Sequence, residues 1–137
     1  MRIGRAAEQA LLETSTIRFY ESAGVLPEPV RSDAGYRDYD EPDVELMRFV
    51  RRLRALGLPL DDIREIVHLR VSGVAPCQPV RDAIAREAEA VDDRMAELAR
   101  LRGELRSLQK RMDSIVDQWP QACVCHVIED TTVRKRS

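Results

Sequence analysis

Residues 14–39 read TSTIRFYESAGVLPEPVRSDAGYRDY, and this stretch decides the fold. Its first part, from about Thr14 to Ala23, is typical of a helix, and Gly24 follows where such a helix would end. Pro27 and Pro29 then impose an extended backbone, because proline fixes its own φ and restrains the residue before it. A short helix followed by an extended passage is therefore expected.

Another helix is expected before this one. Between Met1 and about Ala10, small and apolar residues recur at helical spacing, namely Ile3, Ala6, Ala7 and Ala10. Only about three or four residues connect the two helices, which is the geometry of a helix-turn-helix.

A small β-hairpin, or wing, is expected after the extended passage. Residues 30–39 form two short segments around Asp33-Ala34-Gly35. Gly35 can supply the positive φ that a tight turn between two strands requires.

Two further helices complete an N-terminal domain over residues 1–70. Asp40 and Pro42 are typical of a helix start, and an apolar stripe continues to Gly57. The turn Leu58-Pro-Leu-Asp61 then starts a shorter helix. Residues 71–79 contain one glycine and two prolines, so they are expected to form a linker.

The chain from about Val80 to Asp117 has no proline and predicts one long helix. Its apolar residues step by threes and fours, first as Ile84, Ala88, Val91, Met95 and Leu98, then as Leu101, Leu105, Leu108, Met112 and Ile115. This is a heptad seam of about five heptads, on a helix roughly 57 Å long. The step from Leu98 to Leu101 repeats a three, which is a stammer.

This apolar seam needs a partner, because folding back onto the N-terminal domain would cover only a turn or two. We therefore expect a homodimer whose long helices, over residues 80–118, pair in antiparallel orientation. The expected fold class is mainly α: a winged helix-turn-helix domain followed by a long antiparallel coiled-coil dimerisation helix. The expected dimer interface consists of Val91, Met95, Leu98, Leu101, Leu105, Leu108 and Met112.

Arginine and tyrosine side chains gather on the N-terminal domain. Arginine can bind a phosphate or a guanine edge, and tyrosine hydroxyls commonly contact phosphates. The candidate DNA contacts are Arg18 and Tyr20 on the second helix, Arg31, Tyr36 and Arg37 on the wing, and Arg48, Arg51, Arg52 and Arg54 on the next helix. Residues 1–70 nevertheless carry 11 basic and 13 acidic side chains, and the whole chain has a net charge of −2, so solvated helix faces are an open alternative.

Three cysteines form the second candidate site. Cys77 lies before the long helix, whereas Cys123 and Cys125 lie after it, followed by His126. In an antiparallel dimer the start of one long helix lies near the end of the other, so Cys77 can meet the partner's Cys123 and Cys125. Two symmetry-related sites would result, each with up to three thiolates and the imidazole of His126. Thiolates select thiophilic ions such as zinc, cadmium, lead, mercury or monovalent copper.

Four ordered blocks make a family resemblance specific. They are Thr16-Ile-Arg-Phe-Tyr-Glu21, Gly24-Val-Leu-Pro27, Arg31-Ser-Asp-Ala-Gly-Tyr-Arg-Asp-Tyr39 and Leu56-Gly-Leu-Pro-Leu-Asp-Asp-Ile63. With these blocks the chain resembles the MerR family of bacterial transcriptional regulators, and its long helix and cysteine-containing Val127-Ile-Glu129 region resemble the metal-sensing branch.

The resemblance implies a dimer on a pseudo-palindromic promoter, with Arg18 and Tyr20 in the major groove and Arg31, Tyr36 and Arg37 on the DNA backbone. It implies that the protein represses without effector and, when loaded, distorts the promoter so that RNA polymerase can use it. In similar proteins a cysteine at the position of Cys77 accompanies divalent ions, whereas copper sensors have serine there. A divalent soft metal (Zn²⁺, Cd²⁺, Pb²⁺ or Hg²⁺) that activates a metal-resistance or efflux operon is therefore expected.

Two segments depart from the family pattern. A Thr-Gly-Val-Ser-like turn is usual between the first two helices, whereas this chain has Ala10-Leu-Leu-Glu13, so Thr14 or Ser15 would have to cap the second helix. Relatives tend to carry a cysteine at the end of the dimer helix, where this chain has none. Either Cys123 substitutes for it, or His126 or Asp117 completes a zinc-preferring site.

Other classes of protein fit less well. No paired carboxylates, Ser/His/Asp set or glycine-rich phosphate loop indicates an enzyme. No run of roughly 20 apolar residues indicates a membrane span, and no signal peptide begins the chain, so a cytoplasmic location is expected. A redox- or electrophile-responsive regulator on the same scaffold, and a coiled-coil metal-buffering or interaction module without specific DNA binding, are the alternatives. Residues 119–130 are the expected metal-binding loop, and residues 131–137 a flexible basic tail.

Overall fold

The computed structural model describes residues 1–118 of the 137-residue chain. These residues divide into two compact units, Met1–Glu89 and a second unit that begins at Ala90, and each is described by itself. The mainly helical fold class is confirmed, and the elements are α1 (Ile3–Ala10), α2 (Thr14–Ser22), β1 (Val30–Arg31), β2 (Arg37–Asp38), α3 (Glu41–Ala55), α4 (Leu60–Val71) and α5 (Cys77–Gln118).

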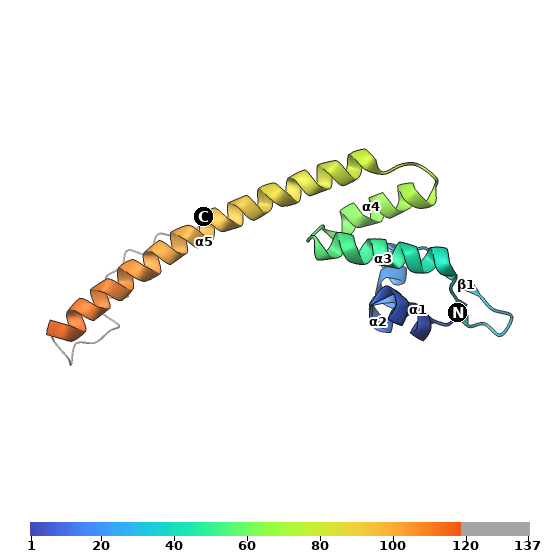
Figure 1. The fold of residues 1–137 in the computed structure, drawn as a ribbon, viewed down its shortest axis with the longest axis horizontal. Helices are drawn as coiled ribbons and strands as arrows, with labels where there is room; N and C mark the ends of the chain where they lie inside the picture. Colours follow the sequence, from blue (N-terminus) through green and yellow to red (C-terminus); the bar gives the residue numbers. More distant parts are fainter. Residues whose placement is uncertain (119–137) are drawn as a thin grey trace. The chain divides into compact units, whose positions relative to one another are not determined.

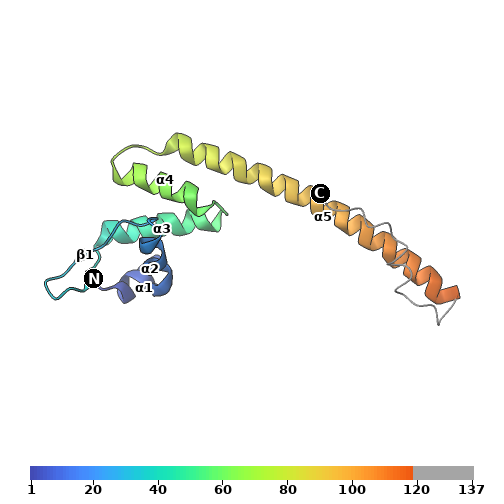
Figure 2. The ribbon, with the colours of Figure 1, turned by 180° about the vertical axis from the view of Figure 1, so that it is seen from behind.

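In the first unit, α3 lies between α4 and the pair formed by α1 and α2, as Figure 1 shows from one side and Figure 2 from behind. The small buried side chains of Ala6, Ala7 and Ala10 let α1 approach α3 closely. The core of this unit also contains one apolar face from each of the other helices, with Ile17, Met47, Leu58, Ile63 and Ile66 among its fully buried side chains.

The turn between α1 and α2 is strained. Leu11 adopts a left-handed backbone conformation with φ of 58°, the only positive φ outside glycine among the described residues. Its side chain is 71% exposed, so packing does little to offset the cost of this conformation. Glu13 is the N-cap residue of α2, and no side chain caps that helix, so the expectation that Thr14 or Ser15 would do so is wrong.

The wing is an antiparallel pair in which Val30 faces Asp38 and Arg31 faces Arg37. Gly35 has a φ of +84°, as the expected turn requires. The helix α3 that follows begins with a capping box: the Asp43 backbone N–H donates to the Asp40 carboxylate, and the Asp40 N–H donates back to Asp43, both over 3.0 Å.

The long helix begins earlier than the sequence suggested. It starts at Cys77, so residues 77–79 of the expected linker are helical, because Pro79 falls in the first turn, where a missing backbone N–H costs nothing. The first unit extends to Glu89 because Ala83 is buried in its core and Val80 packs against that core. Arg86 Nη2 also bonds to Asp62 Oδ1 on α4 at 3.1 Å.

Replacing Leu11 by glycine should raise the free energy of unfolding by about 1 kcal/mol. An L-residue in the left-handed region costs about 1–2 kcal/mol, of which the greater chain entropy of glycine returns a part. Thermal unfolding should shift upward by about 2–8 °C for a change of this size.

Leu56 provides the matched control. It is also an exposed leucine next to a helix end, 59% accessible, but its φ is −76°, so Leu56→Gly should lower the unfolding temperature. If both glycine variants are destabilised equally, the left-handed conformation of Leu11 is not the source of strain.

Candidate DNA interface and thiol site

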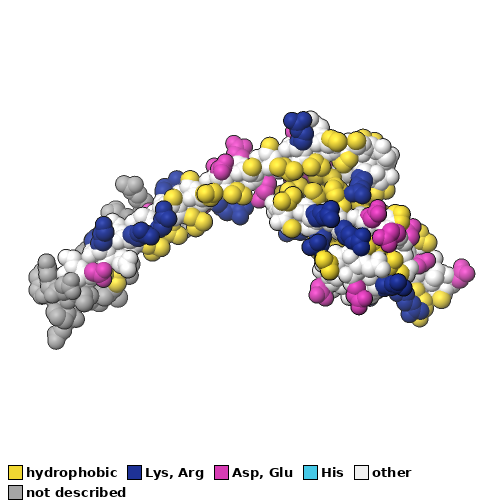
Figure 3. All heavy atoms as spheres, in the orientation of Figure 1, with side chains coloured by type: hydrophobic (Ala, Val, Ile, Leu, Met, Phe, Trp, Pro, Cys, Tyr) yellow, Lys and Arg dark blue, Asp and Glu magenta, His cyan; other side chains and the backbone are white. Residues whose placement is uncertain are grey.

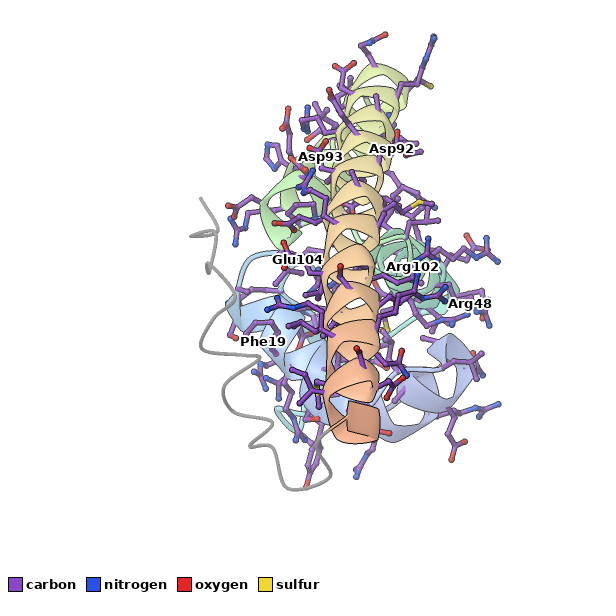
Figure 4. The ribbon with its side chains drawn as sticks, turned by 90° about the vertical axis from the view of Figure 1, so that its left-hand side faces the viewer. Phe19, Arg48, Asp92, Asp93, Arg102 and Glu104 are labelled. Carbon is purple, nitrogen blue, oxygen red and sulfur yellow. The ribbon has the colours of Figure 1, made fainter. Side chains whose placement is uncertain are left out.

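Two buried residues of α2 determine which side chains of this helix face outward. Ile17 and Tyr20 are spaced three residues apart and pack into the core, with Tyr20 only 6% exposed. Tyr20 therefore does not belong to the candidate DNA surface, which is a correction to the expectation. Arg18 and Phe19 are exposed instead, and the Phe19 side chain is 53% accessible. Figure 4 labels Phe19 on this helix.

Sequence reasoning missed Phe19, although a signal was present. Helical spacing places residues 17 and 20 on the same face, so burial of Ile17 implies burial of Tyr20 and exposure of Phe19 between them. An exposed aromatic ring beside Arg18 can make apolar contact with a thymine methyl group in the major groove.

The tip of the wing carries an arrangement that no local sequence pattern predicts. The Arg2 guanidinium stacks over the Tyr36 ring, 4.1 Å from its centroid, and Tyr36 is 54% exposed. Arg31 Nη1 donates to the Gly35 carbonyl oxygen over 3.0 Å. Two exposed arginines and a tyrosine are therefore gathered at the wing, where their remaining N–H and O–H groups can reach a phosphate.

Arg37 has a different environment from the other wing residues. Its Nε donates to Glu21 at the end of α2 over 3.2 Å, and the Tyr39 hydroxyl donates to the other Glu21 oxygen over 2.9 Å. The Glu21 side chain is only 7% exposed. Burial raises the pKa of the Tyr39 phenol, and the neighbouring Glu21 carboxylate raises it further. The trio Glu21, Arg37 and Tyr39 thus joins α2 to the wing.

Two arginines on α3 make hydrogen bonds that stabilise the fold. Arg54 Nη1 donates to the Leu58 carbonyl oxygen over 3.0 Å, across the turn between α3 and α4. Arg48, labelled in Figure 4, donates from Nε to the Gln9 carbonyl oxygen over 3.1 Å and so ties α3 to α1. An Arg54 contact with DNA would have to be made by the other atoms of its guanidinium.

The thiol site falls only in part on the described residues. Cys77 is the first residue of α5 and its side chain is exposed. Cys123, Cys125, His126 and the loop of residues 119–130 lie outside residues 1–118, as does the tail of residues 131–137. Among residues 1–118, no group of three or more His, Cys, Asp or Glu side chains is arranged to hold a metal ion. An exposed thiol at a helix start suits a soft metal ion, provided that further ligands come from elsewhere.

The residues of the expected dimer interface lie on α5 in the second unit, and all of them are at least partly exposed. Val91, Met95, Leu98 and Leu105 are 43%, 63%, 62% and 56% exposed, which is high for large apolar side chains. Leu101, Leu108 and Met112 are partly exposed. Figure 3 shows hydrophobic side chains at the surface along this helix.

A winged helix-turn-helix of this kind belongs to a class of DNA-binding transcriptional regulators. Residues 1–69 match the protein family described as "MerR HTH family regulatory protein", and residues 44–108 match the family described as "MerR, DNA binding". The chain therefore belongs to the MerR family, whose members here are regulators and not enzymes. No helix among residues 1–118 has the length and hydropathy needed to cross a bilayer.

Several relatives are metal-resistance regulators. The HTH-type transcriptional regulator ZntR of Escherichia coli K12 is 32% identical over 93% of this chain and 89% of its own. The mercuric resistance operon regulatory protein of Bacillus cereus is 30% identical over 93% of this chain and 94% of its own. The crystal structure of the regulator PbrR691 of Ralstonia metallidurans CH34 in complex with lead(II) has a TM-score of 0.72 and 39% identity, covering 80% of this chain and 86% of that one. The resemblance to the metal-sensing branch is thus confirmed.

Replacing Glu21 by alanine should lower the free energy of unfolding by about 1–3 kcal/mol, because the half-buried Arg37 and the buried Tyr39 lose their shared acceptor. Glu21→Gln should cost less, since the amide oxygen still accepts from Tyr39. Denaturant unfolding of the purified protein measures both. Glu28→Ala, at an exposed position, is the control. An equal loss of stability in this variant would contradict the role of Glu21 as the shared acceptor.

Proposed function

We propose that this protein is a cytoplasmic, metal-responsive transcriptional regulator. It binds promoter DNA as a homodimer and, on binding a divalent soft metal (zinc, cadmium, lead or mercury), activates a metal-resistance or efflux operon. The observation that carries this proposal is the exposed thiol of Cys77 at the first residue of α5. Relatives named for mercuric resistance, and one crystallised with lead(II), support it.

In the proposed metal site, Cys77 of one protomer and the partner's Cys123 and Cys125 supply thiolates, and the partner's His126 is a further candidate ligand. The bound ion would supply a positive charge that holds the thiolates of both protomers together. Each ligand must lose its proton to bind, so metal affinity should rise with pH through the thiol range.

In the proposed DNA complex, α2 enters the major groove with Arg18 and Phe19 toward the bases. Arg31, Tyr36 and Arg2 bind the phosphates beside the wing, while Arg37 holds the wing through Glu21. Two such domains on one dimer would bind two half-sites, and the metal would change the cost of bending the DNA between them. RNA polymerase then uses the distorted promoter.

A redox response is the second candidate, favoured by the Cys123-Val-Cys125 pair in the sequence. Adjacent-but-one cysteines form strained disulfides, which makes this response weaker on physical grounds. Titration of the reduced, metal-free protein with each of the four ions, followed by thiolate absorbance, separates the candidates. An oxidant response without any metal-dependent signal would favour the redox regulator.

Single substitutions of Cys77, Cys123 or Cys125 by serine should leave promoter binding within about twofold and abolish activation by metal, because serine removes a soft ligand without touching the winged domain. Promoter-reporter activity across a metal series, together with a DNA-binding measurement, tests this. If all three variants respond fully to metal, the thiol site is wrong.

Arg2→Ala and Arg31→Ala should each weaken promoter binding and reduce the slope of log K against log salt by about 0.9 for each phosphate that the variant no longer neutralises. Arg81→Ala is the control, since Arg81 is an exposed arginine on α5, away from the wing. A slope unchanged in both wing variants would show that these two side chains do not bind phosphates.

A further inference from the structure

The outward face of α2 offers few chemical groups to a ligand. The exposed residues of this helix are Ser15, Arg18, Phe19 and Ser22, and their spacing of three, one and three residues places them on one face. The two serines have short side chains, and the Ser22 hydroxyl donates to the Phe19 carbonyl oxygen over 2.9 Å. The longer side chains of this face therefore belong to one cation, Arg18, and one apolar ring, Phe19.

The Phe19 ring is held in position before any ligand binds. Its centroid lies 5.9 Å from that of the Tyr20 ring, and the two planes are inclined by 50°. Such a distance and tilt are typical of stabilising aromatic pairs. Tyr20 is itself fixed, because it is only 6% exposed. The Phe19 carbonyl oxygen also accepts from the Ala23 backbone N–H over 2.8 Å, so the residue is held by the helix as well. The ring therefore has little freedom left to lose on binding.

An exposed phenyl ring can recognise only a narrow range of chemical groups in DNA. It has no hydrogen-bond donor or acceptor, so it makes no conventional hydrogen bond to a phosphate or to the polar edge of a base. The apolar feature of the major groove is the 5-methyl group of thymine. A cytosine that is methylated at carbon 5 presents a methyl group at the same place in the groove. Phe19 at the bases therefore suits a 5-methylated pyrimidine.

Thymine and 5-methylcytosine differ in a group that Phe19 does not sense. The major-groove edge of thymine carries the acceptor O4, whereas that of cytosine carries the donor N4–H₂. A polar side chain that bonds to one of these groups rejects the other. Phe19 has no polar side-chain atom, so it should respond to the methyl group alone. Arg18 does not replace it, because a guanidinium only donates and pairs best with guanine.

We propose that Phe19 makes α2 a sensor of pyrimidine methylation, which favours thymine over uracil and 5-methylcytosine over cytosine by the same factor. The group that it recognises is one 5-methyl group in each half-site, and methylation of a cytosine at that position strengthens binding. This inference rests on the DNA complex of the proposed function and specifies which group on the bases Phe19 recognises.

The expected effect is modest for one half-site and clear for two. Removing one buried methyl group should weaken binding about fourfold. A dimer on two half-sites loses two such groups, so the dissociation constant should rise about 15-fold. A methyl group can also act through the stiffness of the DNA, but that effect would not depend on the residue at position 19.

The test uses the full-length, reduced, metal-free protein and a duplex that it enriches from a random DNA library. Its thymines are replaced by deoxyuridine in symmetric pairs, one pair at a time, and dissociation constants are measured at equilibrium. At least one pair should weaken binding about 15-fold. At that pair, cytosine and 5-methylcytosine are then compared, each opposite guanine, and the methylated duplex should bind about 15-fold more tightly. Each comparison changes only the methyl groups.

Substitutions on α2 connect the methyl group to its contact. Phe19→Ala should lower both ratios to less than about twofold, whereas Phe19→Leu, which stays apolar, should keep both above about fivefold. Thermal unfolding checks that both variants are folded, as expected for an exposed position. Arg18→Ala is the matched control on the same face. It should weaken binding to every duplex and leave both ratios unchanged.

Three results would overturn the inference. They are equal binding of thymine and uracil duplexes at every pair, ratios in Phe19→Ala equal to those of the wild type, and a preference for thymine over uracil without one for 5-methylcytosine over cytosine. If the library yields no enriched duplex, the proposed function fails together with this inference. If duplexes are enriched but the methyl group has no effect, this inference alone fails.

Discussion

A helix of 42 residues cannot bury its apolar stripe with the elements of its own N-terminal unit. Ala83 reaches the core of the first unit, and Val80 packs against it, so one turn of α5 is anchored there. In the second unit, Met95 and Leu98 are 63% and 62% exposed. Leaving such a seam in water forfeits about 1.5–3 kcal/mol for each large side chain that a partner would bury. This constraint is the basis for proposing a second chain along α5.

In the winged domain, the residues of α2 that are buried determine which of its side chains face outward. Ile17 and Tyr20 are committed to the core, which turns Arg18 and Phe19 outward. Glu21, one residue further, has a carboxylate that is almost fully buried between α2 and the wing. Its carboxylate accepts from Arg37 and from Tyr39, and so holds the wing at a set position beside α2. Because α2 and the wing are already held together, neither element has to become ordered when the protein binds a half-site.

Much of this was predictable from local pattern. The helices, the glycine turn of the wing and the cap at Asp40 follow from periodicity and turn chemistry, and they are observed. What could not be predicted depends on contacts distant in sequence. Arg2 stacks on Tyr36 although the two lie 34 positions apart in the sequence, and Glu21 and Arg37 lie 16 positions apart, so no local pattern places them together. The expectation that Tyr20 contacts DNA came from its residue type, and it fails because the helical spacing of Ile17 and Tyr20 places both side chains in the core.

The length of α5 bears on the thiols. Cys77 is the first residue of this helix, which has 42 residues and is therefore about 63 Å long. Cys123 follows Gln118, the last described residue of α5, by only five residues, a length of chain that can cover about 16–18 Å when extended. Since that reach is much shorter than the helix, one chain does not bring Cys77 and Cys123 together while α5 is intact. A site that uses both thiols would therefore take them from two chains, which is why the proposed metal site and the proposed homodimer depend on each other.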